Sequence, residues 1–114
     1  MAVASTKKEA QLQRVAEHFT ITRYFVQLQG SDHLPYKPDP FIVTKIITDQ
    51  RWDPAKTLMV GDTDNDILAG QRAGIATCAA TYGALTEEQL KAYSPDFVIR
   101  SFPAIKTIIS GTSL

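Results

Sequence analysis

The sequence has 114 residues with 12 basic and 12 acidic side chains, so its formal net charge is zero. This balance argues against a nucleic-acid-binding protein that depends on a basic surface, and the length leaves room for one domain. No apolar run approaches the roughly 18–20 residues of a membrane-spanning helix, and a single cysteine permits no internal disulfide. These properties predict one folded unit over residues 1–114, located in the cytoplasm, with neither a membrane nor a nucleic acid as partner.

Strand-like and helix-like segments alternate along the chain. Short apolar segments predict strands at residues 1–4, 24–28, 57–60, 75–79 and 96–99. Apolar residues at helical spacing, or capping residues, predict helices at residues 8–19, 41–50 and 64–73, after Thr86, and after Ser101. This order predicts an α/β domain with a Rossmann-like, mostly parallel sheet, in which ligands bind at the carboxyl ends of the strands.

Local signals mark several helix ends. Asp39 and Pro40 predict a cap and a first helical residue, since proline at that position loses no needed hydrogen bond. Gly74 predicts a helix end. Thr86, with Gln89 three residues later, predicts a capping box.

The densest chemical signal is the segment 61–66, Gly-Asp-Thr-Asp-Asn-Asp, between a predicted strand and a predicted helix. Three carboxylates this close repel one another unless a cation offsets their charge. Mg²⁺ takes oxygen ligands from one or two carboxylates together with water and phosphate, so Asp62 and Asp66 are candidate metal ligands. The competing interpretation is a capped turn, and for Asp64 capping is the one we prefer.

Two further positions follow predicted strands or lie in a restricted loop. Lys37 precedes a proline, which holds its backbone extended and suits a lysine aimed at one phosphate oxygen. Ser5 and Thr6 follow the first predicted strand, where a hydroxyl and backbone amides can hold a phosphate at a helix start. The alternatives are a solvated loop lysine and an ordinary helix cap.

These segments together resemble the C-terminal part of a haloacid dehalogenase-like hydrolase, of the phosphoglycolate phosphatase-like group. The resemblance covers residues 2–109 and is carried, in chain order, by Ser5 and by residues 37–40, 58–66, 69–75 and 81–83. The segment 61–66, together with residues 73–74, is its most specific part.

The resemblance implies a Mg²⁺-dependent phosphatase that forms an aspartyl-phosphate and acts on small phosphate monoesters. It implies that Ser5 hydrogen-bonds the transferring phosphoryl group and that Lys37 neutralises its charge. It further implies that Asp62 binds Mg²⁺ and that Asp66 helps to hold the metal or orients Lys37. Catalysis of phosphoryl transfer by positioning and by charge neutralisation agrees with these assignments.

The sequence departs from the family pattern in one respect. The family's first motif, an Asp-x-Asp that supplies the nucleophile, belongs before Ser5, and so does the helical cap domain. The Asp-x-Asp triplets of this chain are residues 62–64 and 64–66, which belong to the last motif. We therefore expect a small phosphorylated substrate for the parent enzyme and no meaningful turnover by this chain alone.

In this family the absent strand lies at the centre of the sheet. The chain is then expected to close the gap, to borrow a strand, for example in a homodimer, or to lack an N-terminal segment, and we favour the last. The alternative function is a non-catalytic remnant module that binds a phosphorylated ligand or a partner chain. A phospho-receiver domain ranks lower, because its lysine follows the acidic turn, whereas Lys37 precedes it.

Overall fold

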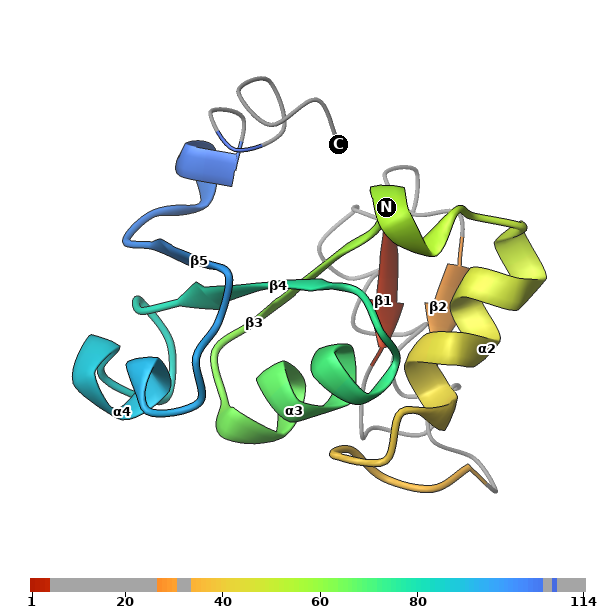
Figure 1. The fold of residues 1–114 in the computed structure, drawn as a ribbon, viewed down its shortest axis with the longest axis horizontal. Coiled ribbons are helices and arrows are strands. Elements are labelled where there is room, and N and C mark those ends of the chain that lie inside the picture. Colours follow the sequence, from red (N-terminus) through yellow and green to blue (C-terminus); the bar gives the residue numbers. More distant parts are fainter. Residues whose placement is uncertain (5–26, 31–33, 106–107, 109–114) are drawn as a thin grey trace, which may run out of the picture.

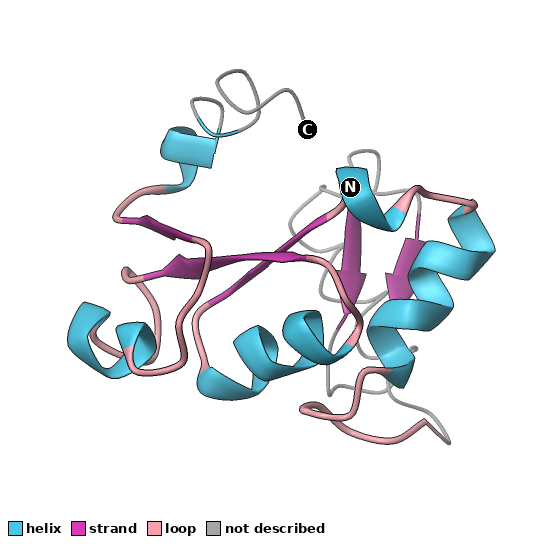
Figure 2. Ribbon diagram, in the orientation of Figure 1, coloured by secondary structure: helices cyan, strands magenta, loops and turns pink. Residues whose placement is uncertain are grey.

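The structure is a computed structural model that describes residues 1–4, 27–30, 34–105 and 108. From residue 27 onward, strands and helical segments alternate along the described chain, as the sequence predicted (Figure 1, Figure 2). Ser5, Thr6 and the helix expected at residues 8–19 lie outside the described residues.

The elements have the following bounds. The strands are β1 (Ala2–Ala4), β2 (Gln27–Gln29), β3 (Leu58–Gly61), β4 (Ala76–Ala80) and β5 (Phe97–Ile99). The helices are α2 (Phe41–Gln50), α3 (Asp64–Arg72) and α4 (Glu87–Lys91), with the 3₁₀ turns η2 (Pro54–Lys56) and η3 (Phe102–Ala104).

The described strands form two parallel sheets. Strand β1 pairs with β2, and β4 lies between β3 and β5 in a sheet of three strands. The predicted α/β class and parallel sheet are therefore confirmed. Within the described residues β1 and β3 belong to different sheets, so the expected gap is not closed by pairing these two strands directly.

Apolar side chains cover both faces of the three-stranded sheet. Ala79 of β4 packs with Ile67 of α3 and Leu90 of α4 on one face. Cys78, its neighbour in β4, points to the other face and packs near Ile105 of the C-terminal segment. The alternation follows from the two-residue period of a strand. Figure 1 shows the resulting layers, with α3 and α4 on one side of the strands of the larger sheet and η3 on the other.

Cys78 is fully buried in this core. Burial raises the pKa of its thiol from 9.0 to about 11, because a thiolate loses its hydration in an apolar environment. The residue is thus a protonated, apolar part of the core at neutral pH.

Helix α2 is the common neighbour of the two sheets. Its buried Ile42, Val43 and Ile47 form one cluster with Ala69 of α3, against which Met59 of β3 also packs. The same helix contacts β1 and β2. At its C-terminal end, Gln50 Nε2 donates to Gln27 Oε1 of β2 (2.9 Å), and Gln27 Nε2 donates to Asp49 Oδ2 (3.0 Å). The position of one sheet relative to the other therefore depends on α2.

Most predicted helix ends are confirmed. Thr86 and Gln89 form the predicted capping box of α4, and Gly74 follows α3 with a φ of 77°. The start of α2 differs by one position: Pro40 is its N-cap, and Asp39 Oδ1 accepts from the backbone N–H of Phe41 (2.8 Å). The proline offers no side-chain acceptor, so the aspartate before it supplies one instead.

Within the described residues, every helix is too short or too polar to cross a bilayer.

Candidate active site

The candidate site lies where β3 ends and α3 begins. Gly61 is the last residue of β3, Thr63 caps α3, and Asp66 lies in the first turn of the helix. Asp66 accepts from the backbone N–H groups of Asp62 and Thr63 and donates its own backbone N–H to Thr63 Oγ1, at 3.2–3.3 Å. These bonds satisfy amides that a helix start otherwise leaves unpaired.

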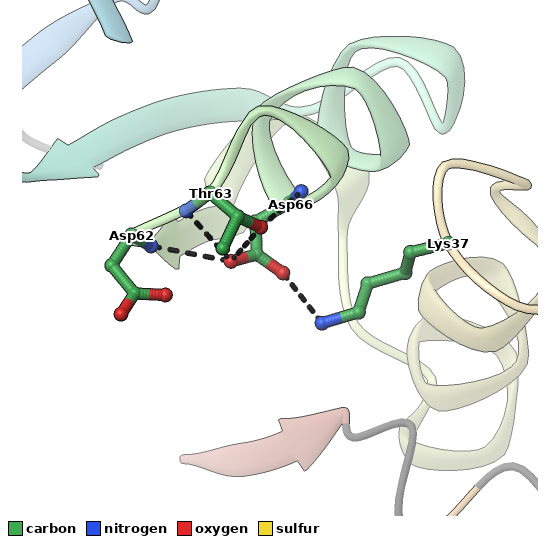
Figure 3. Close-up of polar contacts among 4 residues, drawn as sticks. All are labelled: Lys37, Asp62, Thr63 and Asp66. Atoms are coloured by element: carbon green, nitrogen blue, oxygen red, sulfur yellow. Dashed lines mark hydrogen bonds and ion pairs between the residues drawn. The ribbon is translucent and has the colours of Figure 1, made fainter. Parts of the chain in front are cut away.

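Asp66 and Lys37 form a buried ion pair across 29 residues of sequence. Lys37 Nζ donates to Asp66 Oδ1 at 2.5 Å, and the two side chains are 12% and 9% exposed. Asp66 Oδ2 accepts instead from Thr63 Oγ1 (2.9 Å) and from the two backbone amides (Figure 3). The two oxygens of one carboxylate thus perform both tasks that the sequence left open, capping the helix and fixing the lysine.

Gly61 makes this close approach possible. A Cβ atom at Gly61 would lie 2.1 Å from Asp66 Cβ and 2.5 Å from Asp66 Oδ2. Both separations are far shorter than non-bonded contacts allow. The glycine is therefore required for space, because the carboxylate of Asp66 occupies the volume of a side chain at position 61.

The loop that carries Lys37 is tied to α3. Arg72 Nη1, at the end of α3, donates to the backbone oxygen of Pro38 (3.3 Å), and Asp39 N donates to Tyr36 O (3.1 Å) within the loop. The loop therefore contacts α3 at both ends, through Pro38 at the C-terminal end of the helix and through the Lys37 side chain at its N-terminal end.

Asp62 has a different environment. Its carboxylate lies apart from the Lys37–Asp66 ion pair (Figure 3). Asp62 Oδ2 accepts from the backbone N–H of Ala84 (3.2 Å), in the turn that follows β4. Tyr82 lies in the same turn. Its partial burial is the main reason that the pKa of its phenol is raised, and the neighbouring Cys78 and Asp62 raise it further. The hydrogen bond between Asp62 and the Ala84 amide was not predicted from the sequence.

The chemistry of these donors sets limits on a metal site. Among the described residues, no group of three or more His, Cys, Asp or Glu side chains is placed to hold an ion. Asp62 offers a half-buried carboxylate with one hydrogen bond in the described part of the chain. Such a carboxylate fits Mg²⁺, which takes one or two protein carboxylates and completes its shell with water and phosphate. Both oxygens of Asp66 are engaged, so this residue suits the orientation of Lys37 better than direct ligation.

The structure thus brings Lys37, Asp62 and Asp66 to one end of β3 and α3. Asp64 lies in the first turn of α3, where its charge complements the helix dipole, but the residue that caps the helix is Thr63. The roles of Ser5 and Thr6 lie outside the described residues and stay predictions.

The chain belongs to the haloacid dehalogenase-like hydrolase family, whose model matches residues 1–80. A phosphoglycolate phosphatase from Vibrio parahaemolyticus is 33% identical to it over 96% of this chain and 49% of its own length. Among solved structures, a predicted phosphoglycolate phosphatase from Haemophilus somnus superposes with a TM-score of 0.85 at 30% identity, over 94% of this chain and 48% of its own. A haloacid dehalogenase-like family hydrolase from Streptococcus pneumoniae, at 23% identity and a TM-score of 0.87, shares the fold over 95% of this chain and 51% of its own. This chain spans about half the length of the curated relatives it matches.

Proposed function

We propose that this chain supplies the phosphate-neutralising and metal-binding half of a Mg²⁺-dependent phosphatase that acts on small phosphate monoesters such as phosphoglycolate. The observation that carries the proposal is the buried Lys37–Asp66 pair beside Asp62, at the end of β3. The similarity to phosphoglycolate phosphatases supports the substrate class.

Lys37 is the group that would neutralise the phosphoryl oxygens. An ammonium group carries three N–H donors, so Lys37 can bind Asp66 and a phosphoryl oxygen at the same time. The bond to Asp66 Oδ1 fixes the ammonium before substrate arrives. A charge that is already in place costs no reorganisation when negative charge develops on the transferring group.

Asp62 is the residue that would hold Mg²⁺. A bound Mg²⁺ would neutralise phosphate charge and orient the substrate. The carboxylate of Asp62 lies apart from the Lys37–Asp66 ion pair, so the two acidic residues would serve different groups, Asp62 the metal and Asp66 the lysine (Figure 3).

The nucleophile is the part that this chain does not provide in our proposal. The Asp-x-Asp triplets of the sequence lie within residues 62–66, where Asp66 is committed to Lys37 and to the helix cap. We propose that the attacking carboxylate belongs to the half of the relatives that this chain does not match. The cytoplasmic location, and a homodimer or a missing N-terminal segment as partner, stay predictions.

A joined protein tests the proposal. The 114 residues would replace the matching half of the Vibrio parahaemolyticus enzyme, and hydrolysis of phosphoglycolate would be measured with and without Mg²⁺. We expect Mg²⁺-dependent hydrolysis that falls by about 100-fold or more in Lys37→Met and in Asp62→Asn. The chain alone should hydrolyse at the background rate.

Lys45→Met is the matched control. Lys45 is a lysine of α2 whose ion pair with Asp49 is partly exposed, so its loss should leave the rate unchanged. Metal-dependent hydrolysis by the chain alone, abolished by Asp62→Asn, would contradict the missing nucleophile. A folded joined protein that binds Mg²⁺ and hydrolyses nothing would favour the remnant binding module instead.

A further inference from the structure

The turn after β4 lies against Asp62. Strands β3 and β4 are parallel neighbours, with Gly61 opposite Ala79, so their carboxyl ends emerge at the same edge of the sheet. Asp62 follows β3 directly, and Ala84 comes four residues after the end of β4. The Ala84 N–H donates to Asp62 Oδ2 across 22 residues of sequence.

The turn is anchored on both sides of this contact. Before it, Thr81 donates its backbone N–H and its hydroxyl to Ile99 O of β5, at 3.0 and 3.2 Å. After it, Leu85 packs against the core cluster of α3 and α4, and Thr86 caps α4. The amide that meets Asp62 is therefore held in position by the sheet on one side and by α4 on the other.

Gly83 gives the carboxylate its space. A Cβ atom at Gly83 would lie 2.2 Å from Asp62 Oδ2 and 2.4 Å from Asp62 Cβ, which is closer than non-bonded atoms approach. Among the described glycines Gly74 has the positive φ, so position 83 does not require glycine for its backbone conformation. Glycine at position 83 therefore leaves the space that the Asp62 carboxylate occupies.

We infer that Gly83 and the Ala84 amide form a positioning element for Asp62, which fixes the carboxylate orientation that a Mg²⁺ ion would meet. The inference rests on the proposed function for the metal role of Asp62. A carboxylate oxygen has two acceptor sites, so the bond to Ala84 leaves oxygen lone pairs of Asp62 for a cation. Groups that orient a metal ligand in this way typically change metal affinity by about 10–100-fold when they are altered.

Titration with Mg²⁺ of the ¹⁵N-labelled 114-residue chain tests the inference. In the unaltered chain, the amide resonances of Asp62 and Ala84 should shift with one common dissociation constant. Gly83→Ala should weaken Mg²⁺ binding by about 10-fold or more. Gly74→Ala is the matched control: it strains a glycine with positive φ that has open space around its Cβ position, and Gly74 precedes β4 whereas the turn follows it. It should lower the urea midpoint and leave the Mg²⁺ dissociation constant unchanged.

The outcomes separate the inference from the proposed function. If Mg²⁺ shifts the Asp62 amide while Gly83→Ala binds as tightly as Gly74→Ala, the positioning role is wrong and the metal site stands. If Mg²⁺ shifts no amide of residues 61–66, the metal role of Asp62 is wrong and the inference fails with it. Should Gly83→Ala not fold, the common shift of Asp62 and Ala84 in the unaltered chain still decides, since an Ala84 amide that stays unmoved would overturn the inference.

Discussion

Asp62 and Asp66 belong to the same turn, four residues apart, but their carboxylates have opposite surroundings. Asp66 is buried and binds a lysine, a hydroxyl and two backbone amides. Asp62 is half-buried and accepts one backbone amide in the described part of the chain. Both oxygens of the Asp66 carboxylate are thus used by the turn and by Lys37, whereas the Asp62 carboxylate keeps oxygen lone pairs that can bind a cation. The difference indicates how one acidic turn can both maintain its fold and leave a ligand for a cation.

The largest expected effect comes from removing the committed carboxylate. Asp66→Ala removes the carboxylate that accepts from the Lys37 ammonium and from three other donors in a buried position. We expect the free energy of unfolding to fall by about 3–5 kcal/mol, measured by urea denaturation. Asp66→Asn keeps the shape and one acceptor oxygen and should cost less. A loss below about 1 kcal/mol for the alanine variant would show that the pair is not a structural requirement.

Filling the space beside Asp66 should have the next largest effect. Gly61→Ala places a Cβ atom 2.1 Å from Asp66 Cβ, and overpacking of this kind costs about 1–3 kcal/mol. Thermal unfolding of a double-mutant cycle checks the cause. If the clash is responsible, Gly61→Ala should cost clearly less in an Asp66→Gly background, because the opposing Cβ is then absent. Additive costs would place the strain elsewhere.

Loss of the helix cap should have a smaller effect. Thr63→Ala removes the hydroxyl that accepts from Asp66 N and donates to Asp66 Oδ2, and a cap is worth about 1 kcal/mol. Thr86→Ala in the exposed capping box of α4 is the matched control. Urea denaturation should show the larger loss at position 63, because Thr63 also supports the carboxylate that holds Lys37. Equal losses would reduce Thr63 to an ordinary cap.

The smallest change in stability is expected at Asp62. The amide oxygen of Asp62→Asn still accepts from Ala84 N, so the free energy of unfolding should change by no more than about 0.5 kcal/mol. Isothermal titration with Mg²⁺ should nevertheless show a large loss of affinity, because a hard cation favours a charged oxygen ligand. A loss of stability as large as that of Asp66→Ala would remove the contrast between the two residues.

The fold was predictable where local patterns determine it. The apolar segments around Val60, Cys78 and Val98 predicted the three strands of the larger sheet within one residue at each end. The glycine after α3 and the capping box of α4 were also read from neighbouring residues. In contrast, η2 was missed, because the turn is a short segment that depends on Asp53 accepting from the backbone N–H of Ala55.

The candidate site was predictable in part. Lys37 and Asp66 were expected to meet because the family resemblance implied that Asp66 orients Lys37, and the two side chains form an ion pair. The division of Asp66 into a capping oxygen and a lysine-binding oxygen could not be foreseen, since both roles fit the same residue. The contact between Asp62 and Ala84 was also out of reach, because backbone donors look alike at every position of a sequence. Gly83 is a sequence signal consistent with the close approach of another group to this turn, but it does not identify Asp62 as that group.

Cys78, buried in the middle strand of the larger sheet, gives the chain an internal reporter. Thiol reagents react with the thiolate form of cysteine. A buried thiol with a pKa of about 11 has almost no thiolate at neutral pH. Alkylation of Cys78 therefore requires the sheet to open, and its rate reports the population of the opened state. Because the sequence has a single cysteine, the mass increase on alkylation reports the opening of this sheet alone. Variants of the neighbouring turn can then be ranked by their alkylation rates.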